Sequence, residues 1–234
     1  MSVLAESLDA AIGLVVRADP ALREITLLSL KVSATATLCA ALIGLPLGAL
    51  VALWRSRLAT PIAIVLNAAM GLPPVVVGLL VYLLLSRSGP LGALGWLFTP
   101  SGMVLAQTVL ITPIIAALTR QTIEDHHREL REWFDSLGLT PWRRASTLLV
   151  EARHSLAVAL LAGFGRAVAE VGAVMIVGGN IAGSTRVMTT TIALETSKGD
   201  LPLALALGAL LLALVLIVNV IAQGGRMWLA SDHG

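Results

Sequence analysis

Five long runs of apolar residues limit what this chain can fold into more than any other feature of its sequence. Of all residues, 57% are hydrophobic and 13% are charged, and that charged fraction is about half of the value usual in soluble domains. A hydrocarbon core of about 30 Å is crossed by roughly 20 helical residues. We therefore expect an all-α integral membrane protein with about five transmembrane helices, forming a single domain over residues 1–234. The runs cover residues 25–53, 61–85, 102–119, 155–179 and 201–222.

The segment before the first run, residues 1–19, differs from a cleavable signal peptide. Glu6 and Asp9 precede any basic residue, and the apolar part of this segment, residues 10–16, is short. We expect the segment to form an amphipathic helix that lies at the membrane interface.

The charged residues are gathered in one connection between two runs. Of the 30 Lys, Arg, Asp and Glu residues, 12 lie within residues 120–154. If the five spans alternate across the membrane, this connection shares one side with Arg55, Arg57 and Arg226, and that side holds nine Lys or Arg against six. Basic residues are retained in the cytoplasm. We therefore expect a cytoplasmic loop over residues 120–154, an external N-terminus and a cytoplasmic C-terminus.

Catalytic, metal and nucleic-acid sites find no support in the sequence. The formal net charge is only +2 and the basic residues form no stripe, which argues against nucleic-acid binding. Cys39 is the only cysteine, so thiols cannot build a metal cluster. His126 and His127 would point about 100 degrees apart on a helix, and with His154 and His233 they form no convincing ligand set. A membrane enzyme is thus the weaker alternative, and we expect no catalytic residue, metal or cofactor in this chain.

Helix-breaking residues interrupt three of the runs. Such residues either kink helices for packing or open the backbone where it lines a transport pathway, and the sequence leaves both interpretations open. They are Gly44, Pro46 and Gly48 in the first run, Gly71, Pro73 and Pro74 in the second, and Pro113 in the third.

The charged loop carries the signals of two short helices. The first is expected over residues 124–137 and ends at Gly138, which can take the left-handed conformation that closes a helix. Thr140 resembles an N-cap and Pro141 stands at the first helical position, so the second helix is expected over residues 142–150. These signals are typical of an elbow below the membrane, although an ordinary interhelical hairpin would show them too.

The sequence of residues 132–143 resembles the EAA loop of the permease subunits of bacterial ABC importers. Glu132 and Gly138 keep the spacing of that motif, whereas Trp133 and Phe134 stand where the family has two alanines. The resemblance implies the transmembrane domain of a type I ABC importer in the inner membrane. It also implies a cytoplasmic coupling helix that docks on an ATP-binding subunit. The implied contact residues are Glu132, Asp135, Ser136, Leu137, Gly138 and Pro141.

The energy source must then be a partner. The chain has no G-x-x-x-x-G-K-[ST] phosphate loop, so we expect ATP and Mg to be bound, and ATP to be hydrolysed, by separate ABC subunits. A secondary transporter that works alone is the rival, but it would need no elbow shaped for an ATPase.

A second resemblance concerns the substrate. Residues 163–180, 185–190 and 192–200, with the earlier segment 72–76, resemble the tungstate branch of these permeases, and molybdate permeases are close relatives. The resemblance implies a permease made of two copies of this chain, which receives tungstate from an external oxyanion-binding protein. Molybdate or another small oxyanion is the alternative substrate.

Two charges lie deep in the fourth run and are candidates for a functional site. Arg166 and Glu170 are four residues apart and so share one helical face. Charges at this depth are functional candidates, but a mutual ion pair that holds the bundle explains them equally well. Glycine N-H groups and hydroxyls that follow could also approach an anion, or could simply end a helix and cap a turn. The expected pathway set is Arg166, Glu170, Gly178, Gly179, Arg186, Thr189 and Thr190.

Overall fold

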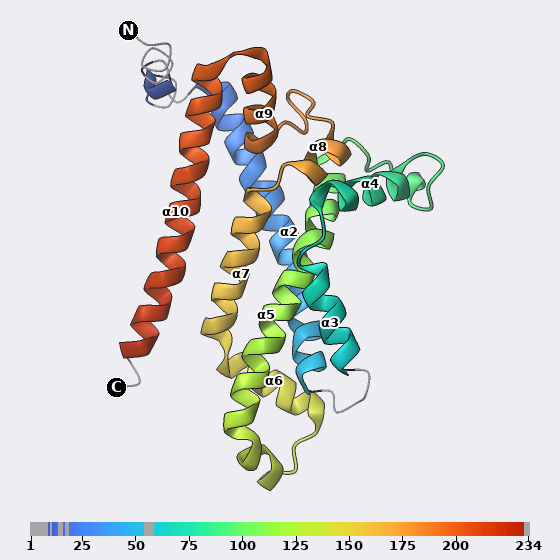
Figure 1. Ribbon diagram of the computed structural model, residues 1–234, viewed down its shortest axis with the longest axis vertical. Coiled ribbons are helices and arrows are strands. Elements are labelled where there is room, and N and C mark those ends of the chain that lie inside the picture. Colours follow the sequence, from blue (N-terminus) through green and yellow to red (C-terminus); the bar gives the residue numbers. More distant parts are fainter. Residues whose placement is uncertain (1–8, 10, 14–15, 17–18, 54–58, 232–234) are drawn as a thin grey trace. The chain divides into compact units, whose positions relative to one another are not determined.

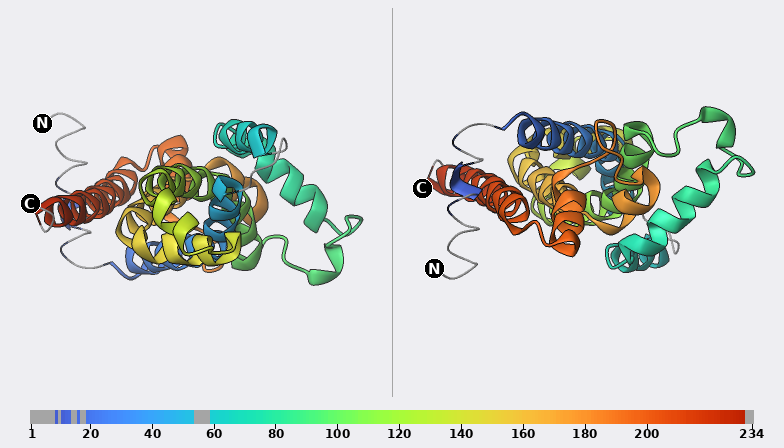
Figure 2. Two further views of the ribbon diagram at one scale, coloured as in Figure 1. Left: turned by 90° about the horizontal axis from the view of Figure 1, so that it is seen from below. Right: turned by 90° about the horizontal axis from the view of Figure 1, so that it is seen from above.

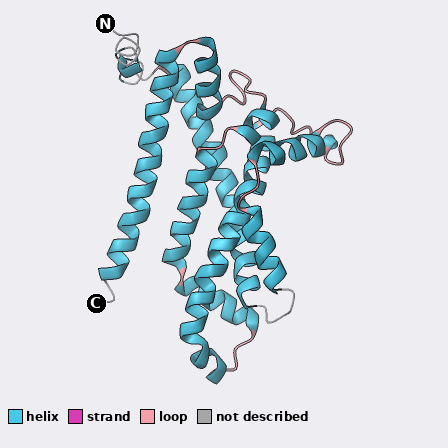
Figure 3. Ribbon diagram, viewed as in Figure 1, coloured by secondary structure: helices cyan, strands magenta, loops and turns pink. Residues whose placement is uncertain are grey.

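The computed structural model describes residues 9, 11–13, 16, 19–53 and 59–231. Its regular structure is helical, and no strand occurs in these residues (Figure 3). The all-α fold class is confirmed, while the expected interfacial helix over residues 1–19 falls largely outside the described residues. The helices in chain order (Figure 1) are α2 (Pro20–Leu53), α3 (Ala59–Ala69), α4 (Pro74–Leu85), η1 (Gly92–Leu94), α5 (Pro100–Ser136), α6 (Pro141–Glu151), α7 (Arg153–Val168), α8 (Gly172–Gly178), α9 (Met188–Lys198) and α10 (Leu201–Ser231).

Three to five membrane spans can be built from the described helices. The helices α2, α5 and α10 are each long and apolar enough to cross a bilayer, and two bent pairs, α3 with α4 and α6 with α7, raise the number to five. The second and fourth apolar runs are nevertheless not single helices. The second is broken at residues 70–73, and the fourth is broken at residues 169–171, between α7 and α8.

The charged loop differs from its prediction in one half. The expected first short helix over residues 124–137 does not exist as a separate element, because α5 continues without a break from the third run to Ser136. The second half is as expected in position, although the side chain of Thr140, at the N-cap of α6, makes no capping hydrogen bond. Gly138 has a φ of +58°, in the left-handed region, and α6 begins at Pro141 after Thr140.

The described chain forms two compact units. Unit 1 consists of residues 1–36, 73–107 and 165–217, and unit 2 of residues 37–72, 108–164 and 218–234. The long helices α2, α5, α7 and α10 each contribute residues to both units.

In unit 2, glycines of α2 allow the close approach of α5. A Cβ atom built at Gly44 would lie 3.0 Å from Cγ2 of Ile115, and one built at Gly48 would lie 2.7 Å from Cβ of Thr119. Glycines four residues apart present a smooth helix face, which is a common way to pack helices in membranes. For Gly44 and Gly48 the structure therefore supports packing, the first of the two interpretations of the helix-breaking residues.

In unit 1, α4 and α8 lie side by side with their backbones close together (Figure 1). A Cβ atom at Gly78 would lie 2.7 Å from Cα of Ala173, and one at Gly172 would lie 2.9 Å from Cγ2 of Val75. Pro74 stands in the first turn of α4, where its missing N-H costs no hydrogen bond. One core cluster of this unit contains Val32, Met103, Val174 and Val187.

Candidate functional site

Two regions contain the candidate residues, and each lies within one unit. The elbow, which we define as residues 132–144, belongs to unit 2, and the residues expected to line a pathway belong to unit 1.

The elbow brings the expected coupling residues together at the end of α5 and the start of α6. Ser136, Leu137 and Gly138 are exposed, and so are Glu132 and Pro141. Asp135 is also largely exposed, but its carboxylate is held by the guanidinium of Arg144, with Nη1 and Oδ1 2.8 Å apart. Five of the six residues therefore present free surface to a partner, while Asp135 also joins the two helices of the elbow.

The inner side of the elbow is an apolar core. Phe134 is fully buried, and Ala145 and Leu148 of α6 lie in the same cluster as Ile123 of α5 and Ala49 of α2. The end-on views show α6 beside the last turns of α5 (Figure 2). The elbow is therefore a folded and packed element.

Sequence reasoning missed two residues of the elbow that have large side chains. Trp133, Leu137 and Trp142 are more than half exposed, and only Leu137 had been named as a contact residue. The available signal was the presence of large apolar residues in a charged connection, because exposed apolar surface marks interaction sites.

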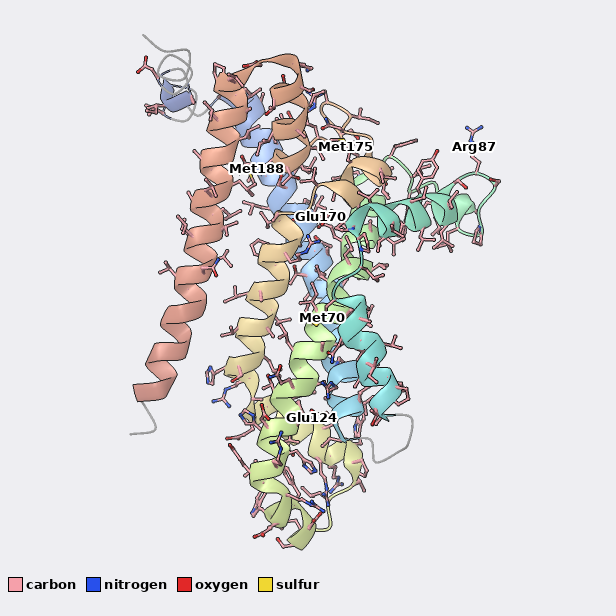
Figure 4. The ribbon with its side chains drawn as sticks, in the orientation of Figure 1. Met70, Arg87, Glu124, Glu170, Met175 and Met188 are labelled. Atoms are coloured by element: carbon pink, nitrogen blue, oxygen red, sulfur yellow. The ribbon has the colours of Figure 1, made fainter. Side chains whose placement is uncertain are left out.

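In unit 1, Glu170 lies at the break in the fourth run, where α7 ends and α8 begins (Figure 4). Only 3% of its side chain is exposed, and it forms an ion pair with Arg166, whose side chain is 38% exposed. The second carboxylate oxygen, Oε1, accepts a hydrogen bond from the N-H of Ala173 at 3.1 Å. Glu170 is thus both an ion-pair partner and a cap for the start of α8.

The carbonyl groups at this break find partners on other helices. Nε2 of Gln107, on α5, donates to the carbonyl of Ala167 at 2.9 Å, and Oγ1 of Thr189, on α9, donates to the carbonyl of Glu170 at 2.7 Å. A broken helix in a membrane needs such partners because no water is present to replace the lost hydrogen bonds. Gln107 was not predicted, although a neutral polar residue in an otherwise apolar run was the available signal.

The glycines and threonines of the expected pathway set have structural roles in this conformation. Gly179 has a φ of +71°, and its N-H donates to the carbonyl of Met175 at 2.9 Å. A Cβ atom at Gly178 would lie 2.9 Å from Sδ of Met103. Oγ1 of Thr190 donates to Oδ1 of Asn180 at 2.9 Å. These groups hold the turn between α8 and α9, so an anion would have to compete with the bonds they already make.

The arginines differ from the rest of the set. Nε of Arg186 is buried without a hydrogen-bond partner among the residues that the structure describes. The guanidinium of Arg166 is partly exposed beside its ion pair. Within unit 1, these two side chains therefore retain positive charge and donor capacity that an anion could use.

Comparison with known proteins gives a consistent result. Residues 44–224, more than half of the chain, match the family described as "Binding-protein-dependent transport system inner membrane component". The chain is 40% identical over 221 residues to the tungstate uptake system permease protein TupB of Peptoclostridium acidaminophilum, which covers 94% of this chain and 97% of that protein. It is 44% identical over 207 residues to a probable anion ABC transporter permease protein of Haloferax volcanii, covering 86% of this chain and 88% of that protein.

A molybdenum permease is also similar, at lower identity. The molybdenum transport system permease protein ModB of Azotobacter vinelandii is 30% identical over 173 residues, which covers 70% of this chain and 76% of that protein.

Proposed function

This chain belongs to the family of inner membrane components of binding-protein-dependent transport systems, and from that premise we propose that it carries tungstate. It is the permease of an ABC importer, and ATP hydrolysis takes place in a partner subunit. The observation that carries the choice of substrate is the similarity to a tungstate uptake permease, which extends over nearly the whole of both chains. Molybdate is the alternative, since both anions are small, tetrahedral and doubly negative.

We propose that two copies of the chain enclose the pathway along a shared twofold axis, as is usual for homodimers. Each copy would dock one ATP-binding subunit, which binds ATP and Mg, and an external binding protein would deliver the oxyanion. The excess of basic residues on the side of the charged loop supports an external N-terminus and a cytoplasmic C-terminus.

The elbow would contact the ATP-binding subunit. Its exposed residues Glu132, Ser136, Leu137, Gly138 and Pro141 would meet the partner directly. Asp135 would act from within the elbow through Arg144. Closure of the ATPase dimer on ATP would push this element and shift the bundle between two states.

Arg166 and Arg186 would supply the positive potential of the pathway, because both keep unused donor capacity. A pathway for an anion must not bind it too tightly, since release would then be slow. The ion pair between Arg166 and Glu170 lowers the net charge beside the pathway, which fits this requirement. Gly178, Gly179, Thr189 and Thr190 would shape the pathway by fixing the backbone around it.

The direct test is metal uptake in cells with and without this chain. Intracellular tungsten and molybdenum would be measured by mass spectrometry at nanomolar tungstate, with molybdate and sulfate as competitors. Loss of tungsten uptake alone is the expected result. Loss of molybdenum uptake with tungsten uptake unchanged would show that the substrate is molybdate, and the assignment as a permease would stand.

A further inference from the structure

Arg144, near the start of α6, reaches back to the end of α5. Its Nε donates to the carbonyl of Leu139 at 2.8 Å, Nη1 donates to Oδ1 of Asp135 at 2.8 Å, and Nη2 donates to the carbonyl of Phe134 at 3.3 Å. One side chain therefore joins the last turn of α5, the connecting turn and α6.

The ring of Phe134 completes this junction. The side chain is fully buried, and the guanidinium carbon of Arg144 lies 5.9 Å from the centre of its ring. The ring of His127 stacks on Phe134 with their centres 6.0 Å apart and their planes inclined by 19°. An arginine over an aromatic face gains cation-π attraction as well as packing. Phe134 stands where the EAA loop has an alanine.

The chemistry of the junction requires arginine in particular. The last carbonyls of a helix have no partner within the helix, and a cation near them is favourable. The planar guanidinium can serve three acceptors in fixed directions while it stacks on a ring, which a lysine ammonium cannot do. Only 16% of the Arg144 side chain is exposed, so water does not easily replace these bonds.

We infer that Arg144 is the positioning residue of the elbow: it fixes the direction of α6 relative to the end of α5, so that displacement of the ATP-binding subunit reaches the membrane helices. This inference rests on the permease function proposed above. The core that contains Phe134 also contains Ala49 of α2 and Leu156 of α7. A rigid elbow therefore moves these helices with it, whereas an elbow that bends at residues 137–140 absorbs the displacement.

The test uses the complete complex of permease, ATP-binding subunit and binding protein, reconstituted in liposomes. Arg144→Ala and Arg144→Lys are compared with Arg153→Ala, a control that removes the same charge from an exposed position outside the elbow, at the start of α7. Anion transported per ATP hydrolysed is measured beside the basal ATPase rate and the amount of ATPase that co-purifies.

For Arg144→Ala we expect the complex to assemble, the basal ATPase rate to stay within about twofold, and transport per ATP to fall about tenfold or more. The loss of a single charge-assisted hydrogen bond already corresponds to about a tenfold change. Arg144→Lys should restore little of the transport per ATP, because lysine keeps the positive charge but lacks the planar guanidinium that serves three acceptors at once. Arg153→Ala should behave as the wild type.

A second measurement reports the geometry directly. Cys39 is the only native cysteine, so a Cys39→Ser background allows spin labels at the exposed positions Glu129 on α5 and Ser146 on α6. The distance distribution should be narrow in the wild type and broad in Arg144→Ala. An unchanged distribution would overturn the inference even for a variant that assembles poorly, and so would unchanged transport per ATP.

Failure of the substrate proposal is distinguishable from failure of this one. If the wild-type complex transports molybdate and not tungstate, the proposed substrate is wrong. The number of anions that Arg144→Ala transports per ATP hydrolysed is then measured with molybdate.

Discussion

Thr189 donates its hydroxyl hydrogen to the backbone carbonyl of Glu170, with 2.7 Å between the oxygen atoms, although 19 residues separate the two in sequence. The bond gives a partner to one of the carbonyl groups that lack an intrahelical hydrogen bond at the break between α7 and α8. Thr189 is buried, so water offers the carbonyl no replacement.

Replacing Thr189 by Val should destabilise the permease, because a buried carbonyl left without a partner costs about 1–3 kcal/mol. Thermal unfolding of the purified complex would measure the loss. Thr191→Val is the matched control, since the Thr191 hydroxyl donates to the carbonyl of Val187 one helical turn away, and that carbonyl also accepts from the N-H of Thr191. Equal melting temperatures for the two variants would contradict the role assigned to Thr189.

The structural role of the ion pair between Arg166 and Glu170 can be tested separately from the positive potential that Arg166 would supply to the pathway. Arg166→Met alone leaves a buried carboxylate without its partner, and breaking a buried pair in this way costs about 3–5 kcal/mol, less where one partner is partly exposed as Arg166 is. Adding Glu170→Gln removes the unpaired charge. We expect the double variant to regain stability and to remain inactive in uptake.

Thermal unfolding and uptake by the same proteoliposomes would check this pair. Recovery of both properties in the double variant would show that the defect of Arg166→Met came from the unpaired carboxylate of Glu170 and that Arg166 has no part in the pathway.

Replacing Arg186 by Ala should lower uptake at limiting tungstate without preventing assembly. A hydrogen bond to a charged group contributes about 1.5–3 kcal/mol, so the expected fall is about tenfold or more. Arg87→Ala is the control, because Arg87 is exposed on the connection after α4 (Figure 4). Normal transport by a purified Arg186→Ala permease would dismiss its pathway role.

Replacing Gly48 by Val should disturb the contact between α2 and α5. A Cβ atom there would lie 2.7 Å from Cβ of Thr119, and overpacking of this kind typically costs about 1–3 kcal/mol. Gly208→Val on α10 is the control, because no atom lies within 4 Å of its added Cβ. Size-exclusion profiles and melting temperatures should separate the two variants, and identical profiles would refute the packing role.

The turn of the elbow can be tested at Gly138. Its φ is +58° and an added Cβ would meet no atom within 4 Å, so any cost of substitution is conformational. Left-handed backbone costs roughly 1–2 kcal/mol for most residues, and asparagine tolerates it better. We expect Gly138→Ala to reduce transport per ATP more than Gly138→Asn does, and the opposite order would exclude the left-handed turn as the cause.

The sequence predicts the helices and the turn of this protein better than it predicts their breaks and cross-links. Apolar runs are a local property, and so are the signals at Gly138, Thr140 and Pro141, which is why these features were found. The expected helix over residues 124–137 was wrong as a separate element, because no residue after position 119 stops α5 before Ser136.

Contacts between distant residues have no local signal. Gln107 and Ala167 are 60 residues apart. Nothing in the sequence near either residue indicates that the side-chain amide of Gln107 donates to the carbonyl of Ala167 at the end of α7. Arg144 was missed for the same reason, since a basic residue in a charged loop looks like solvated surface until its acceptors at Phe134 and Leu139 are known.

The bond between Thr189 and Glu170 also has a consequence for biosynthesis. The ribosome adds Glu170 before Thr189, so this bond cannot form until the start of α9 has been synthesised. The interrupted helix is therefore completed only after α9 has been synthesised and has come to rest against it.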